Sequence, residues 1–224
     1  MNAISTVEME NQNWIVSEAG ECEVFDSSAL SEAFSSKTLD SEDQAVPERV
    51  YRLYRFLTEL EDILAQTADD RARIQAIAPR VRKLLTSSYW LQMEYKEPDP
   101  KQGWAVKFLY REYQFPLTVQ MVTWLPGSGS TIHNHATWGI VAMIGGAEKN
   151  TLWRRVPDAN SPHRIEKVDE MILHPGDIIG FVPGAIHNVE PVGDEPTVSF
   201  NLYGITDRSR RYKFDPERQT AELF

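Results

Sequence analysis

The residues best suited to chemistry are two histidines, His133 and His135, which are separated by one residue. Successive side chains of a β-strand point to opposite faces, so two imidazoles at positions i and i+2 share a face and can converge on one ion. A single pair of this kind is weak support for a metal site. A third histidine, His187, ends a segment that runs from His174 through a Pro-Gly turn, an apolar stretch and a second turn. We therefore predict that His133, His135 and His187 bind one metal ion.

Other ligand types are scarce in this chain. Cys22 is the only cysteine, which excludes an internal disulfide and a cysteine-rich zinc or iron-sulfur site. His163 lies in a polar Asn-Ser-Pro segment and His174 precedes a Pro-Gly turn, so we expect surface or turn positions for both. Any metal must then be held by histidine or carboxylate. The alternative for the three clustered histidines is simple burial with hydrogen-bonded ring nitrogens.

The charge of the chain is concentrated at one end. Of a formal net charge of -10 over 224 residues, residues 1–46 carry -9, from ten Asp or Glu and one Lys, which leaves -1 for the remainder. Binding of nucleic acid needs a concentrated Lys or Arg surface, and neither part offers one, so we expect no nucleic-acid partner. Residues 1–46 are predicted to form an acidic N-terminal arm, either solvated or partly draped over the domain.

The hydropathy pattern argues against a membrane protein. No apolar run approaches the roughly 20 residues needed to cross a bilayer. Met1 to Gly20 lacks the basic start and apolar centre of a signal peptide. We therefore expect a cytoplasmic protein with no membrane partner, present as a monomer or homodimer.

Residues 47–102 carry helical patterns. Apolar residues recur at helical spacing from Val50 to Leu64, and Pro47 suits a first turn. A second helix is predicted from about Asp70 to Thr86, bent or broken near Pro79. Both helices are interpreted as packing elements on the domain that follows.

From residue 103 to residue 224 the pattern changes to short strands separated by turn residues, which is typical of a β-sandwich or barrel. The predicted strands are Phe115 to Val122, Gly139 to Ile144, Thr151 to Val156, Ile178 to Val182 and Thr197 to Tyr203. Pro-Gly, Gly-Gly and Gly-Asp pairs supply turns between them. The predicted fold class is therefore mainly β, with two or so α-helices before it.

Two sequence motifs resemble those of the cupin superfamily. The first motif matches at a glycine, the two histidines and a closing glycine, namely Gly127, His133, His135 and Gly146. The second keeps the relative positions of Gly176, Gly184 and His187, while Pro183 falls one place late and Pro191 replaces the final Asn. The resemblance implies a cupin double-stranded β-helix, which is a jelly-roll barrel.

Gly139 stands where many cupins carry a fourth, anionic ligand. Three neutral imidazoles leave a divalent ion with its full charge and open coordination positions, which favours an anionic substrate beside O2. We expect Fe(II) as the cofactor, and Zn or Ni is also compatible with such a site in the purified protein.

Among cupins, three histidines without the motif glutamate resemble cysteine dioxygenase and related thiol dioxygenases, over roughly residues 104–204. Their Ser-x-His-x-Tyr pattern corresponds to Ser199, Asn201 and Tyr203, with Asn in place of His. The resemblance implies a catalytic role for these residues, in which the phenol hydrogen-bonds or protonates a bound oxygen species. The alternative for Tyr203 is that it only covers the barrel mouth. No Cys lies near the first motif, so the Cys-Tyr crosslink of some family members is excluded.

The family binds its substrate carboxylate through an arginine upstream of the first motif. Ungapped alignment places that position at Lys107, and Arg111 lies further along the same face if the strand is unbroken. Lysine lacks the bidentate fork of arginine, which leaves specificity for cysteine open. Trp138 either walls the substrate pocket or belongs to the core.

Three functions remain compatible with these residues. The first is a thiol dioxygenase that adds both atoms of O2 to the sulfur of a small anionic thiol, such as cysteine or a mercapto acid. The second is another metal-dependent cupin oxygenase that acts on an anionic small molecule. The third is a non-catalytic cupin that binds a metabolite.

Overall fold

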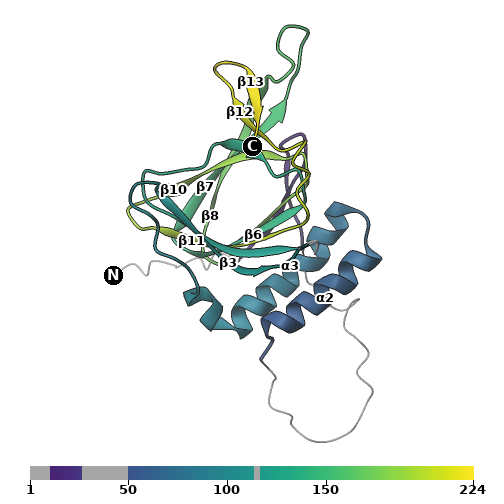
Figure 1. Ribbon diagram of the computed structural model, residues 1–224, viewed down its shortest axis with the longest axis vertical. Coiled ribbons are helices and arrows are strands. Elements are labelled where there is room, and N and C mark those ends of the chain that lie inside the picture. Colours follow the sequence, from purple (N-terminus) through teal and green to yellow (C-terminus); the bar gives the residue numbers. More distant parts are fainter. Residues whose placement is uncertain (1–10, 27–49, 114–116) are drawn as a thin grey trace, which may run out of the picture.

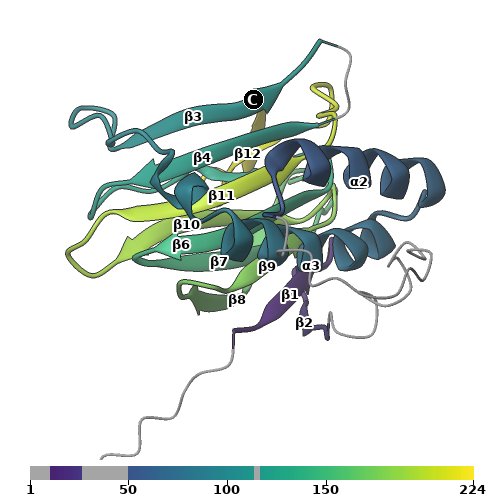
Figure 2. The same ribbon diagram turned by 90° about the horizontal axis from the view of Figure 1, so that it is seen from below.

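The computed structural model describes residues 11–26, 50–113 and 117–224. Its centre is a barrel of two facing β-sheets, with the helices packed outside one of them (Figures 1 and 2). In spatial order, the seven-stranded sheet contains β2 (Cys22–Val24), β1 (Asn13–Val16), β9 (Ile178–Phe181), β6 (Gly139–Gly145), β11 (Thr197–Tyr203), β4 (Thr118–Trp124) and β3 (Trp104–Arg111). The six-stranded sheet contains β13 (Thr220–Leu223), β12 (Tyr212–Asp215), β5 (Ile132–Asn134), β10 (Ile186–Val192), β7 (Ala147–Arg155) and β8 (Ile165–Leu173). The predicted fold class, a mainly β jelly-roll barrel preceded by two helices, is confirmed.

Among the described residues, two α-helices and a short 3-10 helix precede β3. They are α2 (Leu53–Gln66), α3 (Asp70–Ser87) and η1 (Tyr89–Met93). The side chain of Asp69 caps α3 by accepting a hydrogen bond of 2.7 Å from the backbone N–H of Ala72. The predicted break near Pro79 is absent, because α3 continues through this residue for 18 residues in all. Buried apolar side chains on both sides of Pro79 hold the helix against the sheet and offset the lost backbone hydrogen bond.

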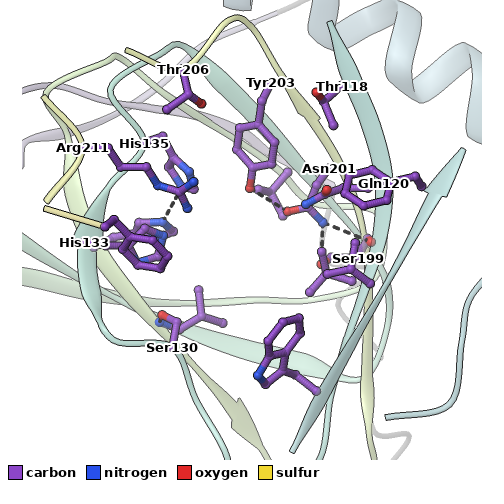
Figure 3. Close-up of a pocket in the computed structure, with 18 of the residues that line it drawn as sticks. Thr118, Gln120, Ser130, His133, His135, Ser199, Asn201, Tyr203, Thr206 and Arg211 are labelled. Carbon is purple, nitrogen blue, oxygen red and sulfur yellow. Dashed lines mark hydrogen bonds between the residues drawn. The ribbon is translucent and has the colours of Figure 1, made fainter. Parts of the chain in front are cut away.

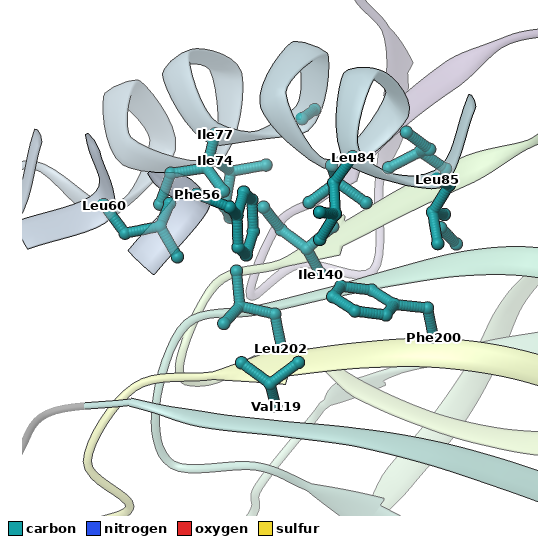
Figure 4. Packing of buried hydrophobic residues seen from close by; sticks show 14 of the residues in the cluster. Phe56, Leu60, Ile74, Ile77, Leu84, Leu85, Val119, Ile140, Phe200 and Leu202 are labelled. Carbon is teal, nitrogen blue, oxygen red and sulfur yellow. The ribbon is translucent and has the colours of Figure 1, made fainter. Parts of the chain in front are cut away.

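The helices cover the outer face of the seven-stranded sheet (Figure 4). Phe56 of α2 meets Phe200 of β11 in an edge-to-face ring contact with 6.3 Å between centroids. Ile74 and Ile77 of α3 and Leu202 of β11 belong to the same fully buried cluster. This layer gives the barrel wall a rigid support on its outer side.

The N-terminal segment corrects one prediction. Within the predicted acidic arm, Asn13–Val16 is a strand that pairs in parallel with β9 and antiparallel with β2. Ile15 and Val16 are fully buried. Of the two alternatives for the arm, the solvated one does not hold for this segment, because its apolar side chains and backbone groups extend the sheet beyond β9. The remainder of residues 1–46 lies largely outside the described residues.

Most predicted strands have a counterpart, with shifted ends. The strands predicted at 139–144, 178–182 and 197–203 correspond to β6, β9 and β11, and β7 begins at Ala147, four residues before its predicted start. The first half of the strand predicted from Phe115 falls partly outside the described residues, and β4 begins at Thr118. In the described part of the chain, no helix has the length and apolarity needed to cross a membrane.

Candidate metal centre

His133 and His187 lie directly opposite each other on the paired strands β5 and β10. His135 follows immediately after β5, and the residue between the two histidines, Asn134, turns outward to bind the backbone of Arg210 and Tyr212. The ligand atoms of the three histidines lie within 4.8 Å of one another, and all three residues are buried. The Nε2 atoms of His135 and His187 are 2.9 Å apart. Such a cluster can hold one metal ion.

Hydrogen bonds fix the orientation of two of the rings. His187 Nδ1 lies 2.9 Å from Oδ1 of Asn150, and His133 Nδ1 lies 2.8 Å from the backbone carbonyl of Thr131. A carbonyl oxygen can only accept, so both Nδ1 atoms carry the proton and both Nε2 lone pairs are available to an ion. Outer-shell acceptors of this kind also raise the basicity of a ligating histidine.

The environment keeps the three imidazoles neutral. Burial lowers the pKa of His133 to about 4, and the nearby positive charge of Arg211 acts in the same direction. Burial lowers the pKa values of His135 and His187 well below the ordinary value, with further repulsion between the clustered rings. Neutral imidazoles are the form that binds a cation, so little proton release is needed at pH 7.

An aromatic ring fills the space beside Gly139. Gly139 of β6 lies opposite Tyr203 of β11, and a Cβ atom added to this glycine would stand 2.6 Å from the tyrosine ring. The same ring stacks on His135, with 4.6 Å between centroids and 28° between planes. Gly139 therefore makes room for Tyr203, which packs against the histidine cluster.

Ser199, Asn201 and Tyr203 share the inner face of β11 and form a hydrogen-bonded chain (Figure 3). The Tyr203 hydroxyl donates to Asn201 Oδ1 at 2.9 Å, and Asn201 Nδ2 donates to Ser199 Oγ at 3.0 Å. The Asn201 amide accepts one hydrogen bond and donates the other, but unlike an imidazole it cannot take up a proton. Burial raises the pKa of Tyr203, so the phenol is protonated at neutral pH.

The two predicted anion-binding residues lie on opposite sides of β3. Lys107 forms an ion pair with Glu94 and does not line the cavity, whereas Arg111 does. The sequence prediction placed them on one face of an unbroken strand. A β-bulge between Phe108 and Tyr110 shifts the register and turns Arg111 inward. Lys107 therefore faces away from the histidine cluster.

Trp138 does not line the cavity. It is buried in the apolar cluster beneath the helices. Of the two interpretations, the core position is the one that the structure shows.

A cavity of about 780 Å³ lies inside the barrel beside the histidine cluster. Besides the predicted residues, it is lined by Asn150 and Glu148 of β7 and by Arg211, which comes just before β12. The two β7 residues were missed because the strand was predicted to start at Thr151. If the two-residue alternation of the predicted strand is extended from Thr151 back to Ala147, Glu148 and Asn150 fall on one face of the strand. The sequence carried no comparable signal for Arg211.

Glu148 is a buried carboxyl group in the wall of this cavity. Its Oε1 accepts a hydrogen bond of 2.6 Å from Thr197 Oγ1, and only 2% of the residue is exposed. Desolvation raises its pKa to about 7, against the partial opposing effect of the Thr197 hydrogen bond. This group is therefore partly protonated near neutral pH.

Comparison with known proteins gives similarities at low identity. No family model matches the chain. An oxalate oxidase in complex with the substrate analogue glycolate is 14% identical, with a TM-score of 0.37, and the match covers 50% of this chain and 55% of that one. This chain thus spans little more than half the length of that oxidase.

Two further solved structures are similar over comparable parts of this chain. An uncharacterized protein with a double-stranded β-helix domain from Klebsiella pneumoniae is 17% identical, with a TM-score of 0.40 and coverage of 52% and 83%. A cupin superfamily protein from Desulfitobacterium hafniense is 11% identical, with a TM-score of 0.38 and coverage of 51% and 87%. The fold class given above rests on strand order and register within this chain.

Proposed function

We propose that this chain is a metal-dependent oxygenase of the cupin superfamily, in which His133, His135 and His187 hold one divalent ion, with Fe(II) as the expected metal. The observation that carries the proposal is the convergence of three buried, neutral imidazoles within 4.8 Å. The hydrogen bonds of His133 and His187 occupy their Nδ1 atoms and leave their Nε2 lone pairs available to an ion. Iron, when bound, supplies the one-electron chemistry that O2 needs to react with an organic molecule.

The ligand set favours an anionic substrate. No carboxylate belongs to the cluster in the described part of the chain, so the ion would keep its full positive charge. The ring of Tyr203 occupies the space beside Gly139 and prevents a longer side chain there from reaching the centre. The cavity wall carries Arg111, Arg208 and Arg211 against Glu112 and the partly protonated Glu148, so its charge is net positive.

A thiol dioxygenase is the first specific reaction that we propose. In this reaction both atoms of O2 bond to the sulfur of a thiol and yield a sulfinic acid, while the S–H and O–O bonds break. Sulfur loses four electrons and O2 gains four, so no other reductant is required. The support is the hydrogen-bonded chain from Ser199 through Asn201 to Tyr203, which fixes a phenol against His135, next to the candidate metal site.

The second candidate is an oxygenase of a larger anionic molecule. A cavity of about 780 Å³ is far larger than cysteine, and its lining includes the apolar side chains of Trp104, Val106 and Val122. Lys107, aligned with the arginine that binds the small thiol acid in the family, pairs with Glu94 instead. These observations favour a substrate with more apolar surface than a mercapto acid.

Elemental analysis combined with oxygen uptake tests both candidates. After iron loading, we expect one iron per chain and O2 consumption with cysteine, 3-mercaptopropionate or cysteamine. His133→Ala should abolish uptake, and His174→Ala, an exposed turn histidine, serves as the matched control that should retain it. A protein that binds iron stoichiometrically yet consumes no O2 with any thiol excludes the thiol dioxygenase and leaves the larger substrate. A site that holds only zinc without O2 uptake would point to the metabolite-binding alternative.

Asn150 offers a separate test of the metal centre itself. Asn150→Ala removes the acceptor that fixes the His187 tautomer, so we expect metal affinity to fall about 10- to 100-fold. The matched control is Asn188→Ala, which loses a hydrogen bond with Trp153 and leaves His187 Nδ1 paired. Competition against a metal chelator measures both. Equal affinities for the two variants would contradict the proposed ligand orientation.

A further inference from the structure

Arg211 is a charged residue beside the histidine cluster that the sequence did not suggest. It lines the cavity, and Figure 3 shows its guanidinium directed toward His133 and His135. Its positive charge acts on the pKa values of both histidines, which confirms that it lies within electrostatic range of the centre. The residue is half-buried at the point where the chain enters β12.

The guanidinium of Arg211 lacks an anionic partner within the described residues. Its Nε is buried without a hydrogen-bond acceptor, and no described carboxylate lies at ion-pair distance. The ring of Phe224 lies 4.2 Å from the guanidinium carbon and covers one face of the group. Burial lowers the pKa of Arg211, and Arg208 adds repulsion. A half-buried cation in this state is stabilised when an anion enters the cavity.

Other arginines of the barrel form ion pairs or are exposed to solvent. Arg154 pairs with Glu166 and Arg164 pairs with Asp158, both on the outer surface. Arg111 and Arg208 also line the cavity, but both are exposed to solvent, and Arg111 rests on the ring of Phe108. Arg211 is therefore the arginine whose charge is both partly desolvated and directed at the candidate metal centre.

The rest of the cavity indicates what the anion is attached to. Apolar side chains from three strands, Trp104 and Val106 of β3, Trp124 of β4 and Val189 of β10, line the wall. Phosphate and other compact polyanions would leave this surface and most of the 780 Å³ unused. A single guanidinium fork matches a single carboxylate in charge and geometry.

We propose that Arg211 binds the carboxylate of an organic substrate whose apolar body fills the tryptophan- and valine-lined part of the cavity, beside the three-histidine centre. A role of this site in catalysis rests on the proposed function, whereas carboxylate binding by Arg211 can be tested without any reaction. It moves the anion-recognition role from Lys107, on the other side of β3, to a residue near the C-terminal hairpin β12–β13.

Calorimetric titration of the full chain with 3-phenylpropionate tests the assignment. We expect saturable binding by the unaltered protein and a loss of about 10- to 150-fold in Arg211→Gln, as for loss of charged hydrogen bonds. Arg211→Lys should recover part of the affinity because the charge is kept and the fork is lost. Arg210→Gln is the matched control, since this exposed neighbour does not line the cavity, and it should bind within about threefold of the unaltered protein.

Four results would overturn the assignment. The first is absence of binding by the unaltered protein. The second is binding that Arg211→Gln leaves intact while Arg111→Gln removes it. The third is equal affinity for the neutral analogue 3-phenylpropionamide, and the fourth is tighter binding of inorganic phosphate than of the carboxylate.

Metal loading separates this inference from the proposed function. Arg211→Gln should retain one metal ion per chain, because the three histidines and their hydrogen bonds to Thr131 and Asn150 are unchanged. If carboxylate binding depends on Arg211 while no thiol or other substrate consumes O2, the inference stands and the oxygenase proposal fails. If O2 uptake is found but carboxylate binding is indifferent to Arg211, the inference fails alone.

Discussion

The two faces of β11 differ in their surroundings: the outer face packs against the helices, and the inner face lines the cavity. On the outer face, Phe200 and Leu202 are fully buried beneath the helices. On the inner face, Ser199 and Asn201 are buried and Tyr203 is partly buried, and the three form a hydrogen-bonded chain in the wall of the cavity. Because adjacent residues of a strand point to opposite sides, the well-packed outer face holds the inner side chains in position. Substitutions on the outer face should therefore change the free energy of unfolding more than those on the inner face.

The largest effect is expected for Phe200→Ala on the outer face. Removal of a fully buried aromatic ring in contact with Phe56 should lower the free energy of unfolding by about 3–5 kcal/mol. Urea denaturation monitored by circular dichroism measures the change. Ser199→Ala, its neighbour on the inner face, is the matched control with a smaller expected loss. Equal losses for the two variants would break the comparison between faces.

Glu148→Gln tests a buried acid on the inner side of the opposite sheet. The folded-state pKa of about 7 lies above the ordinary 4.5, so the folded protein binds the extra proton and is favoured below pH 4.5. That contribution, about 3 kcal/mol, is lost as pH rises from 4.5 through 7. The variant has no ionisable group at position 148. Its free energy of unfolding, relative to that of the unaltered protein, should therefore rise between pH 4.5 and 7.

Urea denaturation of the metal-free protein and the Glu148→Gln variant between pH 4.5 and 8 measures this difference. A stability difference that is independent of pH would show that the carboxyl is not desolvated. Chelator in both samples removes the contribution of metal binding.

An intermediate effect is expected for Gly139→Ala. The added Cβ would meet the Tyr203 ring, which cannot move freely because it also stacks on His135. The overpacking should cost about 1–3 kcal/mol of unfolding free energy. In the Tyr203→Ala background the same substitution should cost much less, and a double-mutant cycle by urea denaturation measures this coupling. Additive effects would mean that the ring and the glycine are energetically independent.

The smallest effect is expected for Tyr203→Phe. The variant loses the hydroxyl donor to Asn201 while the ring keeps its packing on His135, so the loss should be about 1 kcal/mol. Tyr54→Phe, at a side chain exposed to solvent, is the control that should leave unfolding unchanged. A loss as large as that of Phe200→Ala would show that the inner hydrogen bonds hold the barrel together.

Turn residues and strand patterns were enough to predict the fold class, but they did not predict several of the individual strands. β8 was missed because most of its side chains are exposed and its apolar alternation is weak. The short strand β1 was not predicted as a strand, because acidic neighbours mask its apolar residues and the whole segment was interpreted as an arm. Its place in the sheet depends on pairing with β9, more than 160 residues away along the chain.

The sequence by itself determined that His133 and His135 could share one ion and that Ser199, Asn201 and Tyr203 would share one face. Both follow from the two-residue period of a strand, which is a local property. Only the tertiary structure decided that Lys107 faces away, that Arg211 enters the cavity, and that Tyr203 fills the space beside Gly139. These features depend on a β-bulge and on contacts between distant segments, and no local pattern encodes them.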